Sequence, residues 1–169
     1  MNYKKYIRPG KTTSDMTPLI ADAKAFNSLI KDLCKLFENE SIDKIAGIEA
    51  MGFILGAGVA NRLGIGLILL RKDGLQNDFY SQQYVDYTHK EKTLSIHKDA
   101  IKENEKILVI DDWIETGGTI KAVINLIEKC KGKIVGVGVL RDDSSDETRN
   151  FLKEYNYKYL DKVATGDNF

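Results

Sequence analysis

The sequence predicts an α/β fold, in which helices cover both faces of a mainly parallel five-stranded sheet. Short apolar runs rich in β-branched residues recur along the chain, as expected of strands that are buried on both faces. Segments with helical periodicity lie between these runs, and such alternation gives a parallel sheet with right-handed crossovers. The 169 residues are enough for one domain with a substantial core.

The first half of the chain contains two helical patterns and two strand patterns. One helical pattern repeats apolar residues at helical spacing, and the other is rich in small residues that let a helix pack closely on a sheet. Each strand is a short apolar run that ends at a charged residue. In chain order these elements are a helix over 22–37, a strand over 44–48, a helix over 52–63 and a strand over 65–70.

The second half repeats the alternation. Its strands are "ILVI", "IVGVGVL" and the weaker "YKYL". After the first of them, Ile120, Val123, Ile124 and Ile127 form the apolar stripe of a helix packed on one side. The expected elements are a strand over 107–110, a helix that opens at the end of 111–119, a strand over 134–140, a helix over 146–155 and a strand over 157–160.

Residues 73–93 interrupt this alternation of strands and helices. The segment is polar and aromatic without a helical stripe, and alternation in "FYSQQYVDY" allows a long hairpin. About twenty residues without their own element are uncommon in a compact domain unless they are functional. Both ends return to predicted strand tips, so we expect a flexible lid over those tips, with a solvent-exposed hairpin as the alternative.

Composition and charge argue against several classes of function. Lys plus Arg equals Asp plus Glu at 25 each, so no net basic field favours nucleic acid or an anionic membrane. The N-terminus has no apolar signal segment, and no stretch approaches the roughly 18 apolar residues of a membrane span. We expect a cytoplasmic protein that binds neither nucleic acid nor membranes.

The segment 111–119, "DDWIETGGT", joins a predicted strand to a predicted helix. In open α/β sheets, ligands bind in the crevice at the carboxyl ends of strands. Gly117 and Gly118 let backbone N–H groups converge on an anion, and the helix N-terminus adds its positive dipole. Thr116 and Thr119 add hydroxyl donors. Together these features predict a phosphate site.

Asp111 and Asp112 immediately precede this site and would repel a phosphate unless they bind something else. Vicinal sugar hydroxyls or a hydrated Mg²⁺ are the natural partners of such a pair. A ribose phosphate with Mg²⁺ nearby is therefore expected. A P-loop is disfavoured because no Gly-Lys-Ser/Thr follows, and the dinucleotide fingerprint is absent after every predicted strand. An ordinary strand–turn–helix junction is the remaining alternative.

The string "VIDDWIETGGT" resembles the phosphoribosyl-pyrophosphate (PRPP) binding motif of type I phosphoribosyltransferases. "IAGIEAMGFILGAGVANRLGIGLILLRKDG" and "LSIHKDAIKENEKILVIDD" resemble the adenine-specific members in order and spacing, and the likeness runs from Arg8 to about Leu140. The resemblance implies a three-layer, Rossmann-like fold in a single domain over 1–169. It also implies a small N-terminal hood at 1–25 and a flexible lid at 73–93.

The same resemblance implies an enzyme that transfers the 5-phosphoribosyl group of PRPP to a purine and releases pyrophosphate, with adenine as the expected base. PRPP and the base would be its partners, Mg²⁺ its cofactor and a homodimer its assembly. One alternative is a phosphoribosyltransferase for hypoxanthine, guanine, xanthine or another heterocycle. The other is a regulator that senses PRPP or nucleotides without turnover.

The family motifs carry roles over to particular residues. The catalytic acids would be Asp86, Asp111 and Asp112, with Mg²⁺ held by the last two through water. The phosphate of PRPP would lie on Glu115, Thr116, Gly117, Gly118 and Thr119. Pyrophosphate would lie on Arg71, Lys72 and the turn Glu49, Ala50, Met51 and Gly52, which in relatives often holds a non-proline cis peptide. Tyr84 and Tyr87 would belong to the lid.

Several positions depart from the adenine-specific pattern. Thr13 and Ser14 stand where those relatives carry Phe-Arg, so an aromatic ring able to stack on a purine is missing there. Met51 replaces an arginine beside pyrophosphate, and Glu115 places a negative charge beside the phosphate cradle. Trp113 fits a core position better than a stacking platform. Taken together, these departures bear on whether adenine is the base, and they leave the PRPP motifs largely intact.

Overall fold

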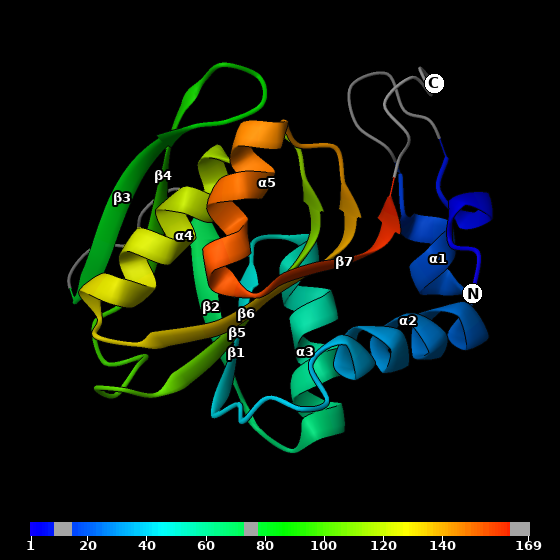
Figure 1. Cartoon of the computed structure of the whole chain (residues 1–169), viewed down its shortest axis with the longest axis horizontal. Coiled ribbons are helices and arrows are strands. Elements are labelled where there is room, and N and C mark those ends of the chain that lie inside the picture. Colours follow the sequence, from blue (N-terminus) through cyan, green and yellow to red (C-terminus); the bar gives the residue numbers. More distant parts are fainter. Residues whose placement is uncertain (9–14, 73–77, 163–169) are drawn as a thin grey trace.

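The computed structural model describes residues 1–8, 15–72 and 78–162. Its centre is a seven-stranded sheet with the strand order β3-β4-β2-β1-β5-β6-β7, drawn in Figure 1. Neighbouring strands from β2 to β7 in this order are parallel. β4 pairs with β2 in antiparallel orientation, and β3 pairs with β4 in the same way at the edge of the sheet. The predicted α/β class is confirmed, and the sheet is larger than the five strands expected.

The strands are β1 (Lys44–Ile48), β2 (Gly66–Lys72), β3 (Phe79–Val85), β4 (Glu91–His97), β5 (Lys106–Ile114), β6 (Lys133–Asp142) and β7 (Tyr157–Lys162). The helices are η1 (Lys4–Tyr6), α1 (Thr17–Ala21), α2 (Ala23–Leu36), α3 (Met51–Leu63), α4 (Gly118–Lys129), α5 (Asp146–Leu152) and η2 (Lys153–Tyr155). Within the described residues, no helix has both the length and the apolar character needed to cross a bilayer.

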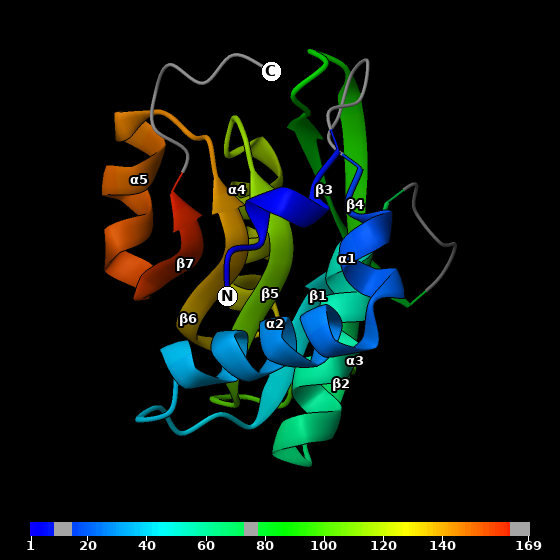
Figure 2. The same cartoon turned by 90° about the vertical axis from the view of Figure 1, so that its right-hand side faces the viewer.

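Two apolar clusters, one on each face of the sheet, make the structure three layers thick. In β5, Leu108 and Ile110 pack with the helices α2 and α3, whereas Ile107 and Val109 pack with α4. All four side chains are fully buried, which explains why this strand is a continuous apolar run. Figures 1 and 2 show the sheet between these two groups of helices.

The N-terminal segment packs on the α2–α3 side. Tyr3 and Leu19 are buried in that cluster, and the hydroxyl of Tyr3 donates a 2.6 Å hydrogen bond to Asp32 Oδ2. Arg8 and Asp15 exchange two backbone hydrogen bonds of 3.0 and 2.8 Å, which bring residues on either side of 9–14 together. Thr13 and Ser14, the two departures noted in this segment, lie outside the described residues.

The predicted lid contains a hairpin that belongs to the sheet. Tyr84 of β3 and Leu94 and Ile96 of β4 are buried in the cluster that includes α4. β4 also pairs with the end of β2, where Lys72 lies opposite Leu94. The described part of the segment is therefore anchored in the core along its strands, while its motion as a lid stays a prediction.

The order of the strands places a switch point between β1 and β5. From β1 the chain passes through α3 to β2 on one side, and from β5 it passes through α4 to β6 on the other. Crossovers that leave neighbouring strands in opposite directions open a crevice at their carboxyl ends. Residues that follow β1 and residues at the end of β5 border this crevice.

We predict that Leu94→Ala lowers the free energy of unfolding by about 2–5 kcal/mol, because it removes a fully buried side chain from the hairpin's contact with the core. Val85→Ala is the matched control, since the side chain of Val85 is 50% exposed. Urea denaturation of the two variants measures both effects. Equal losses would show that the hairpin is not anchored through Leu94.

Candidate active site

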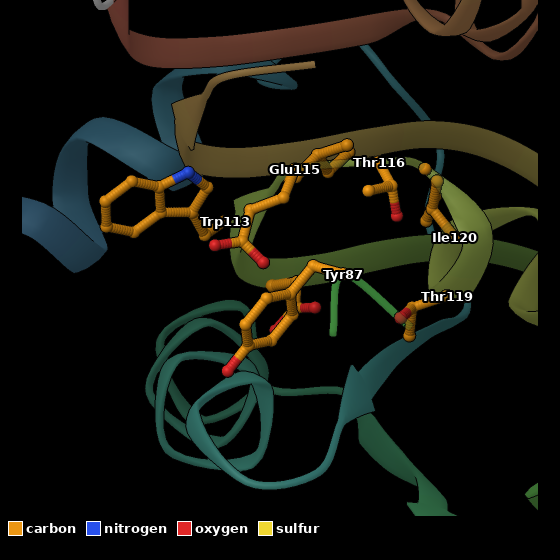
Figure 3. Close-up of a pocket in the computed structure, with 9 residues that line it drawn as sticks. Tyr87, Trp113, Glu115, Thr116, Thr119 and Ile120 are labelled. Carbon is orange, nitrogen blue, oxygen red and sulfur yellow. The ribbon is translucent and has the colours of Figure 1, made fainter. Parts of the chain in front are cut away.

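The carboxyl ends of β1, β2 and β5 enclose a cavity of about 260 Å³. A neighbouring pocket, drawn in Figure 3, runs along the start of α4. The two spaces share five lining residues, namely Tyr87, Asp111, Trp113, Glu115 and Thr119. Eleven of the predicted site residues line one or both spaces, namely Glu49, Ala50, Met51, Lys72, Tyr87, Asp111, Asp112, Glu115, Thr116, Gly117 and Thr119.

The turn after β1 is tied to the end of β2. The carboxylate of Glu49 accepts a 2.8 Å hydrogen bond from the backbone N–H of Lys72, and the Glu49 N–H donates to the carbonyl of Leu70. The peptide bond between Glu49 and Ala50 is cis, as the resemblance implied. This arrangement fixes the turn beside the segment that carries Lys72.

Gly52 allows the start of α3 to lie directly against the end of β5. A Cβ atom at this position would be 2.8 Å from Oδ1 of Asp111 and 2.9 Å from the carbonyl oxygen of Ile110. The carbonyl belongs to the sheet and cannot move aside easily. A glycine is therefore required for the turn and the acid pair to share one cavity.

Asp111 and Asp112 are adjacent carboxylates at the bottom of this cavity. Burial raises the pKa of both side chains, and the charge of Asp112 raises the pKa of Asp111 further. Lys72 acts in the opposite direction on each pKa. Two adjacent acids whose ionised forms are disfavoured in the free protein are suited to a ligand that supplies positive charge or hydroxyl donors.

The donor set fits Mg²⁺ in the manner of a substrate-bound ion. Among the described residues, no group of three or more His, Cys, Asp or Glu side chains is placed to hold a metal. Mg²⁺ is commonly bound by one or two carboxylates together with waters and phosphate oxygens of a substrate. Asp111 and Asp112 match that pattern, and they are the residues that would hold it.

The loop from Glu115 to Thr119 leads into α4. Gly117 has φ of 85° and immediately precedes the first residue of α4. The first N–H groups of a helix have no partner within it, and no side chain caps this helix end within the described residues, so these N–H groups are left for a ligand. A Cβ atom on Gly117 would lie 2.5 Å from Cγ2 of Thr148, whose hydroxyl donates a 3.1 Å hydrogen bond to the carbonyl of Thr116. Thr148 of α5 thus supports the loop from behind.

Thr148 was not among the predicted site residues, although the sequence contained a signal for its position. Ser145 caps α5 by accepting a 3.2 Å hydrogen bond from the N–H of Thr148. Such a cap was detectable in "SSDET", but its contact with a loop some thirty residues earlier depends on the packing of α5. Gly118 meets a different neighbour, since a Cβ there would meet the carbonyl oxygen of Val85 at the end of β3.

Three predicted residues lie elsewhere. Arg71 lines a separate pocket with Leu69 and Phe79, because adjacent strand residues point to opposite faces and Lys72 occupies the cavity side. Tyr84 is buried in the core beneath the hairpin. Asp86 is absent from the lining of both spaces described above.

The carboxylate of Asp86 organises the turn between β3 and β4. Its Oδ1 accepts hydrogen bonds from the hydroxyl of Thr88 at 2.6 Å, the N–H of Thr88 at 2.8 Å and the N–H of Lys90 at 3.1 Å. The hydrogen bond from the Thr88 hydroxyl is the main reason that the pKa of Asp86 is lowered. This carboxylate is therefore engaged within its own turn.

Trp113 lines both spaces, contrary to the core position expected for it. The guanidinium carbon of Arg141 lies 4.0 Å from the centre of its ring, and the indole N–H is buried without a hydrogen-bond partner. β5 continues through Trp113, two residues after Asp111. Residues two apart on a strand share a face, so a longer predicted strand would have placed Trp113 beside the site.

Residues 18–166 match the family model described as the phosphoribosyl transferase domain. The chain belongs to the phosphoribosyltransferase family. Its sequence is 39% identical over 158 residues to the adenine phosphoribosyltransferase of Streptococcus uberis, covering 93% of this chain and 91% of that relative. It is 43% identical over 129 residues to the enzyme of the same name from Trichlorobacter lovleyi, covering 76% and 75% of the two chains.

A solved structure gives the same result for the fold. The adenine phosphoribosyltransferase of Thermoanaerobacter pseudethanolicus superposes with a TM-score of 0.85 at 36% identity, covering 95% of this phosphoribosyltransferase and 98% of that chain. The predicted family and its fold are therefore confirmed.

We predict that Asp111→Asn makes the ligand-free protein more stable by about 1 kcal/mol at neutral pH. The raised pKa of Asp111 means that the folded state binds its proton more tightly than the unfolded chain does. The contribution of Asp111 to folding stability is therefore fully present below the unfolded pKa of 3.8 and is lost as pH rises through the raised pKa of the folded state. Asparagine does not ionise, so the variant does not lose stability in this way.

Urea denaturation between pH 4 and pH 8, without Mg²⁺ or PRPP, measures this difference. The gain should shrink towards the acidic end of the range. Asp99→Asn, at an exposed position, is the control. A less stable Asp111→Asn protein at pH 7 would contradict the assignment of a disfavoured charge to this site.

Proposed function

We propose that this phosphoribosyltransferase transfers the 5-phosphoribosyl group of PRPP to adenine, forming AMP and pyrophosphate in purine salvage. The observation that carries the proposal is the convergence of the loop 115–119, the acid pair and the turn 49–52 on connected space at one sheet edge. The adenine phosphoribosyltransferases among its relatives support the choice of base. Mg²⁺, a homodimer and a cytoplasmic location belong to the same proposal.

The 5-phosphate binds at the start of α4. Backbone N–H groups from Thr116 to Thr119 and the hydroxyls of Thr116 and Thr119 are the donors, and the helix dipole favours the anion. Because Thr148 holds the Thr116 carbonyl from the opposite side, the loop needs little rearrangement to bind. Binding energy from this remote phosphate then positions the reacting carbon of the sugar.

The acid pair binds the sugar next to the phosphate. The carboxylates of Asp111 and Asp112 accept hydrogen bonds from the two ribose hydroxyls, and the same pair would hold Mg²⁺. Bound Mg²⁺ supplies positive charge that stabilises the departing pyrophosphate. Asp111 meets the turn through Gly52, so the sugar and pyrophosphate sites are held in one fixed relation.

Pyrophosphate leaves along the turn Glu49–Gly52 and the side chain of Lys72. Displacement at the anomeric carbon develops positive charge on the sugar and negative charge on the leaving group. The protein therefore contributes mainly by positioning and by placing charge where it develops. Among the described residues that line the cavity, Lys72 is the cation that can face the leaving anion.

The β3–β4 hairpin would cover the bound substrates during the reaction. Tyr87 lies at the tip that joins β3 and β4, lines the cavity and is 41% exposed, so it stands at the entrance. Closure of this tip over bound PRPP would exclude water, which otherwise hydrolyses the activated sugar.

A Mg²⁺-dependent assay of pyrophosphate release tests the function. The chain is incubated with PRPP and with adenine, hypoxanthine, guanine, xanthine, uracil or orotate in turn. We expect release with adenine above every other base. Faster release with a different base would replace adenine, and PRPP binding without release from any base would indicate a sensor.

We predict that Asp112→Asn raises the barrier of the reaction by about 3 kcal/mol, a rate loss of roughly 150-fold, because it removes one charge from the sugar site. The change keeps the size of the side chain, so circular dichroism should show an intact fold. Asp99→Asn is the matched control and should retain wild-type turnover. Unchanged turnover in Asp112→Asn would remove the acid pair from the mechanism.

A further inference from the structure

We propose that Trp113 and Glu115 form the base-binding end of the cavity, with Trp113 as the stacking surface and Glu115 as the acceptor for an N–H group of the base. The inference rests on the proposed function and adds to it the residues that recognise the base. Neither residue was expected to contact a base, since Trp113 was assigned to the core and Glu115 to the phosphate.

The pocket has two chemically different ends. Figure 3 shows the side chains of Trp113, Glu115 and Tyr87 gathered at one end, and those of Thr116, Thr119 and Ile120 at the other. The threonine end contains the loop that binds the 5-phosphate. The base is attached at the opposite side of the ribose from that phosphate, so it must lie towards the aromatic end.

Trp113 is held in a fixed orientation. It is paired in the sheet with Arg141, whose guanidinium lies 4.0 Å from the ring centre and forms a 3.1 Å salt bridge with Asp143. Arg141 is 3% exposed, so this support is buried. Trp113 also lines both spaces of the site. A flat surface fixed before binding favours stacking with a planar heterocycle.

Glu115 has an unused carboxylate. The side chain lies in the cavity lining and is half-buried, and it makes no hydrogen bond or salt bridge within the described part of the chain. Asp86 differs, because its carboxylate already accepts three hydrogen bonds in its own turn. A carboxylate removed from water favours a donor strongly, and an ionised one can only accept.

Charge argues against a role for the Glu115 side chain on the phosphate. A carboxylate and a phosphate repel each other, and the N–H groups of the loop already satisfy the anion. The base offers the opposite chemistry, since its ring and amino N–H groups are donors. The partner that suits Glu115 is therefore a planar, uncharged heterocycle with a donor on the edge that faces it.

Steady-state kinetics of Glu115→Gln and Trp113→Ala with adenine and with PRPP as the varied substrate test the proposal. We expect kcat/KM for adenine to fall roughly tenfold to a hundredfold in each, the range for a lost charged hydrogen bond or a lost stacking surface. The dissociation constant of PRPP with Mg²⁺, measured by calorimetry, should stay within about twofold. Trp113→Phe keeps a ring and should lose less than Trp113→Ala.

Glu103→Gln is the matched control, because Glu103 is exposed and pairs only with Lys131 at the surface within the described chain. Wild-type kinetics for adenine in both Glu115→Gln and Trp113→Ala would overturn the inference, as would an equal loss of PRPP affinity. If Trp113→Ala does not fold, the near-isosteric Glu115→Gln and Trp113→Phe decide the question. Absence of pyrophosphate release from the wild type with every base would instead refute the proposed function.

Discussion

The site depends on how closely the start of α3 approaches the end of β5. At Gly52 there is no room for a Cβ atom, because it would lie against the Asp111 carboxylate. The strands β1 and β5, which precede these two residues or carry them, are neighbours in the sheet. Residues about sixty positions apart are thereby placed against each other without any long side chain to bridge them. Glu49 extends the arrangement to β2 through the N–H of Lys72. Three strand ends then act as one rigid frame for the sugar and its leaving group.

This frame surrounds two carboxyl groups, Asp111 and Asp112, whose ionised forms are disfavoured in the free protein. Asp111 and Asp112 are adjacent and partly buried, and Lys72 is the one cation among the described residues that line the larger cavity. A site of this kind gives up some stability for a strong preference for ligands that bring hydroxyl donors and a metal ion. The phosphate end is built differently, with backbone N–H groups and a supporting threonine. The two ends therefore select different parts of the same substrate.

The sequence was sufficient for the parallel strands and the main loops, because buried strands and a glycine-rich helix start leave strong local patterns. β3 and β4 were less visible, since their polar and aromatic residues alternate and few aliphatic residues, such as Leu94 and Ile96, indicate the core. The predicted end of β5 at residue 110 was too early, as the strand continues to Ile114, and this hid the position of Trp113. Arg71 and Thr148 could not be assigned from local patterns for a different reason. The face of the sheet to which Arg71 points and the packing of Thr148 against the loop depend on the tertiary structure.

The most direct test of the account is a titration with ribose 5-phosphate followed by the backbone amide signals in ¹⁵N–¹H NMR spectra. The account predicts saturable shifts of the amides of residues 116–119, with smaller changes at the neighbouring acid pair. Binding that saturates elsewhere while those four amides keep their positions would contradict it, and so would no binding at millimolar ligand.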